Sequence, residues 1–394
     1  KEYLKIPRGA LVAKDGRYRV QLTEELWETS YTDEVALVAV DHPDSVDAVV
    51  DERFVPPGPP VKLNLYATRQ VRPPVSVVDD RGTDLMPQLR DADFRFAADF
   101  DLGKFQGITS QHDLIVDLGP ELGDGQVLLM LRGWVFPTDA SVNVSIAQGK
   151  SVAVMWPVLD VKDRSGNWKP AITDLSIPSG KNKLVVVDLT GKLATSDHHV
   201  RIRTNVEIYW DQVSVATTAP KSPTTITRLH SESAEVHYRG FSRMFRKGGR
   251  YGPHWFDYAD VAREPAWRPI AGKFTRYGDV NALLQSSDDE YIVMSPGDET
   301  TIDFDANAAP SLPKGWVRDF FLYSDGWIKD ADRNTANGAS VTPLPFHAMT
   351  GYPYSAAERY PADAAHRQYT EQYNTREMEQ RWSLRDARDQ RLQK

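Results

Sequence analysis

The sequence has 394 residues, of which 41% are hydrophobic and 26% charged, and its net charge is −8. This length suits two or three domains with sizeable cores, and the acidic balance argues against nucleic-acid binding, which calls for a basic field. The absence of cysteine excludes disulfides, a thiolate nucleophile and a cysteine zinc site. No apolar run reaches the length of about 18 residues that a transmembrane helix needs.

Residues 1–60 are predicted to form a β segment followed by a linker. Arg17–Leu22 alternates polar and apolar residues, which is typical of a strand with one solvated face. Val35–Val40 is a continuous apolar run and predicts a buried strand. The proline-rich run at 55–60 predicts a stiff, extended linker. Because the chain opens on KEYLKIP without a signal peptide, we expect a processed or partial chain.

Residues 61–220 are predicted to fold as a jelly-roll-like, antiparallel β-sandwich. Turn signals separate short segments that are rich in β-branched residues, and Asp163–Trp168 predicts a hairpin tip. Alternating strands and helices are absent, so a doubly wound nucleotide-binding fold is not expected. The predicted strands are His112–Leu118, Val127–Phe136, Ser141–Ala147, Lys183–Leu189 and Val200–Val215.

Residues 221–355 are predicted to form a second, irregular and aromatic-rich β unit, after a bridge at Thr217–Thr225. Strand signals recur at Tyr291–Met294, Thr300–Asp305 and Val317–Tyr323. Two interpretations stay open at this point. These strands could build a unit of their own, or they could complete the preceding one.

Residues 356–394 are predicted to be a polar helical tail, because they are charged and nearly free of β-branched residues. Asn374 with Glu377 resembles an N-cap and its partner three residues later, which predicts one helix before and one after Asn374. Tyr369 and Tyr373 stand four apart and should share a helix face, as should Met378 and Trp382. The predicted fold class is therefore mainly β, with antiparallel sandwich or jelly-roll units and a short C-terminal helical tail.

The best candidate for a cation site is the segment Asp325–Asn334. Asp325, Asp330, Asp332 and Asn334 offer four side-chain oxygen donors within ten residues, and Ca²⁺ binds through such oxygens. The EF-hand pattern fails, because no closing glutamate stands in register. The alternative is a solvated loop held by Asx turns. No cofactor other than Ca²⁺ is indicated.

Aromatic residues are the strongest argument for ligand binding. Trp168 at the hairpin tip, Trp255 and Trp327 are the candidates for stacking on a sugar, since acidic or basic side chains stand near each in sequence. The alternative is that these rings pack in cores and between units. Nothing in the sequence marks a catalytic residue, because there is no G-x-S-x-G elbow and no H-E-x-x-H motif.

Several segments together resemble the C-terminal region of bacterial exported proteins that carry FG-GAP/VCBS repeats, the cartilage-acidic-protein-like group. The resemblance covers nearly the whole chain. It implies an extracytoplasmic protein with propeller-like repeats upstream, and it brings no activity and no calcium site to these residues. The segments are Glu2–Pro7, Val38–Pro43, Asp51–Phe54, His237–Arg243, Arg276–Val280, Arg318–Trp327, Lys329–Asp332 and Pro343–His347.

Three functions are therefore open. The first is a non-catalytic structural or interaction module of an extracytoplasmic bacterial protein or assembly, which would bind a protein partner or itself. The second is a carbohydrate-binding β-sandwich protein. The third is a hydrolase of polysaccharides or esters, which needs two carboxylates, or a carboxylate and a histidine, in one cleft.

Overall fold

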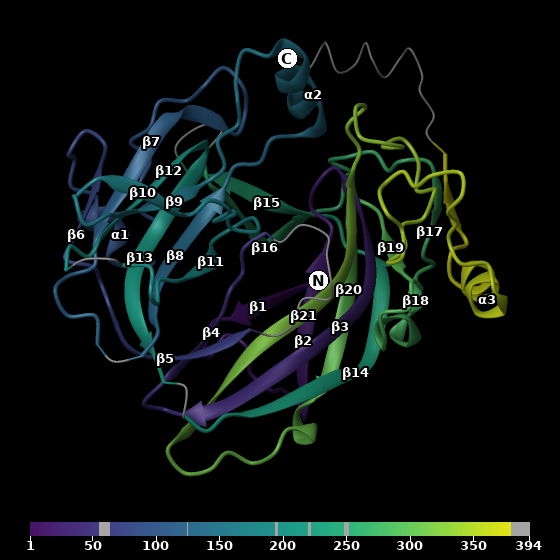
Figure 1. Cartoon of the computed structure of the whole chain (residues 1–394). Coiled ribbons are helices and arrows are strands. Elements are labelled where there is room, and N and C mark those ends of the chain that lie inside the picture. The colour runs from purple at the N-terminus through teal and green to yellow at the C-terminus, as the bar shows by residue number, and fades with distance from the viewer. Residues whose placement is uncertain (55–63, 124, 194–195, 220–221, 248–251, 380–394) are drawn as a thin grey trace.

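The computed structural model describes residues 1–54, 64–123, 125–193, 196–219, 222–247 and 252–379. The protein is mainly β, and its strands pair antiparallel throughout the named sheets (Figure 1). This confirms the fold class predicted from the sequence. The predicted linker at 55–60 lies outside the described residues, as do Trp382 and the rest of the tail beyond residue 379.

The larger sheet has eight strands, and its two longest strands pair along almost their full length. β3 (Glu28–Pro43) and β21 (Trp316–Asp330) form this pair, and Val35–Val40 within β3 is buried as predicted. The main path runs β1-β21-β3-β14-β20-β2, and β18 and β19 join β14 and β3. The other strands are β1 (Glu2–Ile6), β2 (Arg17–Thr23), β14 (Thr225–Tyr238), β18 (Gly278–Asp279), β19 (Ile292–Met294) and β20 (Asp298–Asp305).

This sheet curls around its own core. Tyr18 at the β2 edge and Phe320 near the opposite edge have ring centroids only 4.7 Å apart. Leu37, Val236, Ile302 and similar side chains from the inner face fill the space between them. Curling of this kind follows from the right-handed twist of strands, which brings distant edges of a long sheet together.

The other unit is a sandwich of two five-stranded sheets, and it includes β4 (Asp47–Val50), which lies before the predicted start of the sandwich at residue 61. Their inner faces meet in one apolar core, to which Leu114 and Ile202 contribute from one sheet and Leu131 and Val213 from the other. One sheet is β10 (Trp168–Ile172), β9 (Val158–Lys162), β12 (His199–Val206), β7 (Ile108–Asp117) and β6 (Ser76–Asp79). The other is β11 (Lys183–Asp188), β8 (Val127–Val135), β13 (Ile208–Thr218), β5 (Leu65–Arg72) and β4 (Asp47–Val50).

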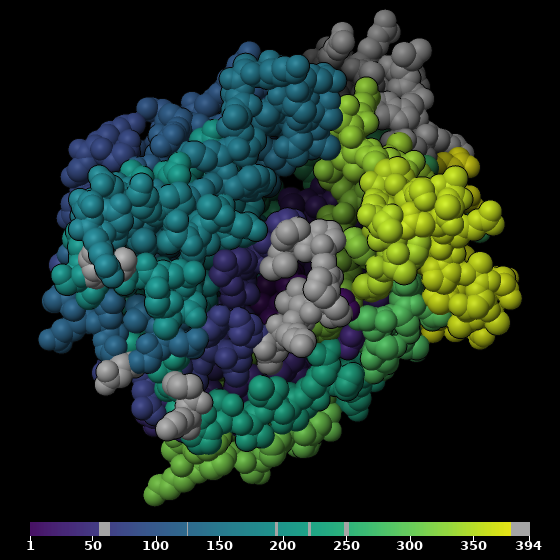
Figure 2. Space-filling model, in the orientation of Figure 1, coloured from purple at the N-terminus to yellow at the C-terminus, as the bar shows by residue number. Residues whose placement is uncertain are grey.

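The chain enters the curled sheet, leaves it for the sandwich and then returns. Strands β1–β3 within residues 1–43 share a sheet with β14 and later strands, so the second predicted unit is completed by the first residues of the chain. The two units meet where Ala48 and Val50 of β4 pack against Val38 and Phe321 of the curled sheet. Figure 2 shows that one face of the molecule is hollowed between the two units.

Two small ribbons and short helices complete the fold. The hairpin β15 (Phe241–Arg246) and β16 (His254–Ala262) reaches the sandwich, where the His254 ring lies 5.4 Å from Trp134. β17 (Gly272–Phe274) pairs with β22 (Arg376–Met378). The helices are α1 (Met86–Leu89), α2 (Ala140–Gly149), α3 (Ala364–Gln372) and the 3-10 turns Asn281–Leu284 and Ala306–Ala308.

Three local predictions were wrong. The predicted strand Val200–Val215 is two strands, β12 and β13, which belong to different sheets. The predicted strand Ser141–Ala147 is the helix α2, because the Asp139 carboxylate caps it by accepting the Val142 N–H at 2.7 Å. Its alternating valines and isoleucine imitate a strand, but only Ile146 is buried. The second tail helix does not begin at Asn374, because residues 376–378 form β22.

The first tail helix is present as α3. Asn374 is buried after it, where its amide donates to Tyr369 Oη at 2.9 Å and accepts from Thr275 Oγ1 at 3.2 Å. Tyr369 and Tyr373 do share a face, with ring centroids 6.3 Å apart. These contacts dock the tail onto β17 and onto the core of the curled sheet.

Candidate functional site

A β-bulge places two carboxylates on the same side of the curled sheet. Asp325 stands opposite Glu34, but the next residue, Gly326, stands opposite Thr32, so Asp33 is the extra residue of β3. A bulge of this kind redirects side chains that regular pleating would send to opposite faces. Position 326 requires glycine, because a Cβ there would lie 2.2 Å from the Tyr31 carbonyl oxygen.

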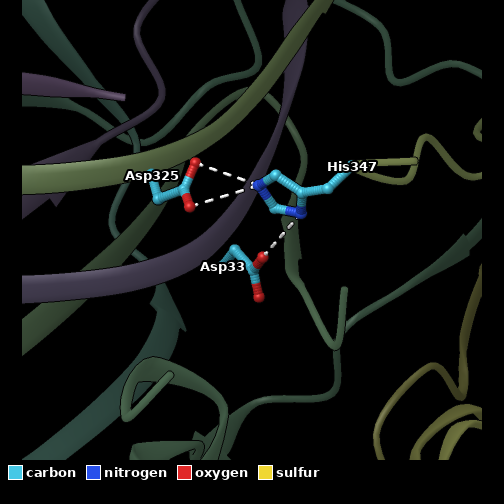
Figure 3. A group of neighbouring side chains, drawn as sticks. All are labelled: Asp33, Asp325 and His347. Carbon is cyan, nitrogen blue, oxygen red and sulfur yellow. Dashed lines mark hydrogen bonds and ion pairs between the residues drawn. The ribbon is translucent and has the colours of Figure 1, made fainter. Parts of the chain in front are cut away.

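His347 lies between these carboxylates (Figure 3). Its Nε2 is 3.2 and 3.3 Å from the two oxygens of Asp325, and its Nδ1 is 2.6 Å from Asp289 Oδ1 and 3.5 Å from Asp33 Oδ2. Lys1 Nζ completes the group with an ion pair to Asp325 at 2.8 Å. We call Lys1, Asp33, Asp289, Asp325 and His347 the Asp325 centre.

The carboxylates of Asp33 and Asp325 are closed off from solvent, whereas the histidine is reached from outside. Asp33 has an exposed fraction of 0% and Asp325 of 2%, while the His347 side chain is 31% exposed. The Asp33 oxygens accept the backbone N–H groups of Asp288 and Asp289 at 3.1 and 3.2 Å. The loop that carries Asp289 therefore forms one wall of the centre.

These surroundings shift the proton affinities in opposite directions. Burial raises the pKa of Asp33 to about 7, against the lowering effect of the two backbone N–H groups. Hydrogen bonds to Asp289 and Asp325 raise the pKa of His347 to about 10. Burial alone would raise the pKa of Asp325, but hydrogen bonds from His347, Lys1 and Ser287 hold it well below its usual range. At neutral pH the imidazole is therefore charged.

The geometry is not that of a serine hydrolase. The Ser287 hydroxyl lies within hydrogen-bond distance of Asp325 and, at 3.0 Å, of Glu34 Oε2, so its single proton is directed to a carboxylate rather than to the imidazole of His347. Both imidazole nitrogens already face carboxylates, so neither is placed to take the serine proton. The arrangement is suited to holding positive charge, either a proton on His347 or a metal ion.

The structure separates the residues of the predicted cation loop. Asp325 joins Asp33 and His347, whereas Asp330 accepts hydrogen bonds from Asp332 N at 3.1 Å and from Thr335 Oγ1. Asp332 accepts from Asn334 N at 2.7 Å, an Asx turn, and from Ser141 Oγ at 2.8 Å. Asn334 also donates to Ser141 Oγ at 2.8 Å, so this loop links the curled sheet to α2.

The three candidate tryptophans lie on three different sheets. Trp168 does begin β10 at the end of a hairpin, but the cationic groups of Lys162 and Arg201 lie over its ring, 5.3 and 5.0 Å from the centroid. Trp255 is 42% exposed and stacks on Phe245. Trp327 is half-buried against the cluster around Tyr31, and its ring lies 6.1 Å from that of His347.

Sequence reasoning missed Asp33, Asp289 and His347 as partners of Asp325. Asp33 lies far from Asp325 along the chain, and only strand pairing brings the two together. One signal was present: Gly326 interrupts a strand pattern, and an isolated glycine in a strand marks a bulge or a close backbone approach.

Comparisons of the sequence with family models, with curated proteins and with solved structures found no match. Among the described residues, no helix has the length and apolar character needed to cross a membrane.

Proposed function

We propose that the chain is a non-catalytic interaction module of an extracytoplasmic bacterial protein or assembly, and that it binds protein through an aromatic surface. This surface consists of Trp27, Tyr238, Tyr258 and Trp267, which are 40%, 37%, 58% and 38% exposed. Large aromatic rings are enriched at protein interfaces, where they bury much area at a low cost in conformational entropy. The exposure of these four rings is the observation that carries the proposal.

A buried ionic frame holds the aromatic surface in place. Glu25 accepts hydrogen bonds from the Ser242 N–H and hydroxyl at 2.7 and 2.6 Å, and from Arg239 Nη1 at 3.1 Å. The Arg239 guanidinium donates to the Tyr258 carbonyl at 2.6 Å, and the Trp267 indole donates to the Glu25 carbonyl at 3.2 Å. The rings are therefore preorganised, which reduces the entropy lost on binding.

The compartment in this proposal comes from the resemblance to exported bacterial proteins described above. The absence of cysteine is compatible with it, because a domain with large cores needs no disulfides. The Asp325 centre supports a structural role as well, since its closed ion pairs tie β3, β21 and the His347 loop together.

Self-association gives a direct test. Sedimentation velocity from about 1 to about 100 µM should show a concentration-dependent dimer, because mass action favours association at high concentration. The double variant Trp27→Ala/Tyr258→Ala should stay monomeric. Trp156→Ala is the matched control, because Trp156 is 55% exposed and belongs to the sandwich rather than to this surface. A chain that stays monomeric throughout, or association that survives the double variant, shows that the aromatic surface does not bind a second copy of the chain. Turnover of ester or glycoside substrates contradicts the non-catalytic role.

Carbohydrate binding is the second candidate, and the position of Trp255 favours it. Its ring stacks on Phe245 at 6.1 Å with an interplanar angle of 17° while its other surroundings leave it 42% exposed. An exposed, rigidly stacked indole can cover the apolar face of a sugar. A glycan array would test this, with Trp255→Ala expected to abolish binding and Trp168→Ala to leave it unchanged. Binding that survives Trp255→Ala removes this candidate site.

A further inference from the structure

We propose that Asp33, Asp325 and His347 together bind one divalent transition-metal ion of the zinc class. Each residue offers one ligand atom, and the three atoms lie within 4.8 Å of one another. Ligands of a tetrahedral zinc ion lie about 3.4 Å apart, so small side-chain rotations close the site. This inference is independent of the aromatic surface.

The Asp33 carboxylate is buried with little positive charge to compensate it. It is fully buried, and the hydrogen bonds it accepts within the described part of the chain come from two uncharged backbone N–H groups. The nearby His347 Nδ1 is 3.5 Å away and is already bonded to Asp289 at 2.6 Å. A buried carboxylate normally has a charged partner or a metal ion, and Asp33 has no hydrogen-bonded cation of its own among these contacts.

The strand that carries Asp325 carries another buried carboxylate, which is fully compensated by cations. Asp319, six residues before Asp325 on β21, is also buried, and it pairs with Arg8 Nε at 2.8 Å, Lys5 Nζ at 3.0 Å and His42 Nε2 at 3.2 Å. We call Lys5, Arg8, His42, Asp47 and Asp319 the Asp319 centre. It holds three cationic groups for two carboxylates, because Asp47 also pairs with Lys5 and Arg8.

The Asp325 centre has the opposite balance. Three carboxylates, those of Asp33, Asp289 and Asp325, share one imidazole and Lys1. A divalent ion in place of the imidazole proton would cancel this excess of negative charge, and no such need exists at the Asp319 centre. The Asp319 centre is therefore a control for the Asp325 centre, because it is a buried ionic group with no excess of carboxylates.

The donor set identifies the class of ion. An imidazole nitrogen with carboxylate oxygens suits zinc and similar transition metals, whereas Ca²⁺ takes six to eight oxygens. Asp289 fits the role of a residue that orients the ligand. Its hydrogen bond to Nδ1 would leave Nε2 free to face the ion beside Asp325, as in the carboxylate–histidine–zinc arrangement.

The test is calorimetric titration of the chelator-treated, metal-free chain with Zn²⁺. The wild type should bind one ion per chain, and Asp33→Asn and His347→Gln should each weaken binding at least about 10-fold, as expected when a donor is lost. Asp332→Asn is the matched control. It removes a carboxylate from the loop singled out by sequence, and zinc affinity should not change. Circular dichroism establishes that each variant is folded, and His347, being partly exposed, is the more tolerant position.

Other results overturn the inference. It fails if the folded wild type binds no zinc, or if both variants bind it as tightly as the wild type does. Binding of Ca²⁺ without Zn²⁺ would reject the ion class. Substitution with Co²⁺ gives a second readout, because visible absorption bands of a tetrahedral complex should appear with the wild type and be lost in His347→Gln.

Discussion

The Asp319 and Asp325 centres use the same residue types on the same strand to opposite effect. In the Asp319 centre the ladder is regular, with Asp319 opposite Val40, and the surrounding cations come from β1, the turn after it and the end of β3. In the Asp325 centre a bulge adds a second buried carboxylate, and a loop adds a third. Local sequence around the two aspartates does not show this difference, which is made by the segments packed against them.

The pKa shifts follow the same division. Burial would raise the pKa of Asp319, but His42, Arg8 and Lys5 hold it far below its usual range. Burial raises the pKa of Asp33 to about 7. The cationic side chain beside it, His347, is shared with Asp289 and Asp325 and offsets this only in part. One centre therefore stabilises the charged carboxylate, and the other leaves one carboxylate undercompensated. Substitutions that change the charge balance of one centre should therefore show that the Asp319 centre is structural and that the Asp325 centre binds the metal ion.

The largest effect is expected at Asp319. Asp319→Ala leaves Lys5, Arg8 and His42 without their shared carboxylate, and breaking such a buried ion group costs about 3–5 kcal/mol. Urea denaturation measures the free energy of unfolding. The matched control is Asp101→Ala, which removes the exposed pair with Arg81 and should cost less than about 1 kcal/mol. If the two variants lose the same free energy of unfolding, the Asp319 centre stabilises the fold no more than an exposed ion pair does.

Gly326→Ala should break the bulge that separates the two centres. The added Cβ would meet the Tyr31 carbonyl at 2.2 Å, and relieving that overlap should cost about 2–3 kcal/mol. Because Asp33 and Asp325 would also move apart, zinc binding should be lost. Gly149→Ala is the control, since its Cβ meets nothing closer than Ser151 Oγ at 3.6 Å. Retention of full zinc affinity in a folded Gly326→Ala would mean that the bulge does not position the ligands.

The stabilities contributed by Asp33 and Asp319 should respond to pH with opposite sign. Asp33 has a raised pKa, so in metal-free protein the folded state holds its proton more tightly than the unfolded state between about pH 4 and pH 7. Stability therefore falls as pH rises through that window. Asp319 has a lowered pKa, so its contribution is complete above about pH 4 and is lost as the pH falls below that.

Unfolding in urea with a chelator tests this contrast. Wild type should lose about 2–3 kcal/mol relative to Asp33→Asn between pH 5 and pH 8, because the asparagine cannot ionise. Saturating zinc should abolish that loss. If the difference between the two proteins stays constant across this range, Asp33 does not titrate as its burial predicts.

Much of the fold could be predicted from sequence, because strand patterns are local. Val35–Val40 and Val317–Tyr323 lie in β3 and β21 as expected, and the sandwich strands are largely in place. The prediction of a strand at Ser141–Ala147 was wrong because the alternating β-branched residues were given more weight than the helix N-cap at Asp139. The prediction of a helix N-cap at Asn374 was wrong because the Asn374 amide makes a buried tertiary contact with Tyr369 instead of capping a helix.

The candidate site could be predicted only in part. Asp325 was selected for its acidic neighbours in sequence, yet Asp330, Asp332 and Asn334 use their side chains in turns and in contacts with α2. Its spatial partners Asp33 and His347 come from a distant strand and from a loop after β21. Composition cannot show such contacts, since they depend on strand register, and a register shift of one residue at Gly326 decides them.

The smallest effect, and the one that most directly tests the charge balance, concerns the two lysines. Lys1→Ala removes a partly exposed ion pair with Asp325 and should cost less than about 1 kcal/mol of stability. Because it also removes a positive charge that competes with a metal ion, zinc affinity should rise by about 3-fold to 10-fold. Lys5→Ala removes the corresponding cation from the Asp319 centre and should leave zinc affinity unchanged. If both variants change the zinc affinity equally, the affinity reflects the overall charge of the chain. If Lys1→Ala weakens zinc binding, Lys1 supports the site rather than competing with the ion. Only a rise confined to Lys1→Ala shows that the excess of carboxylates at the Asp325 centre is what attracts the ion.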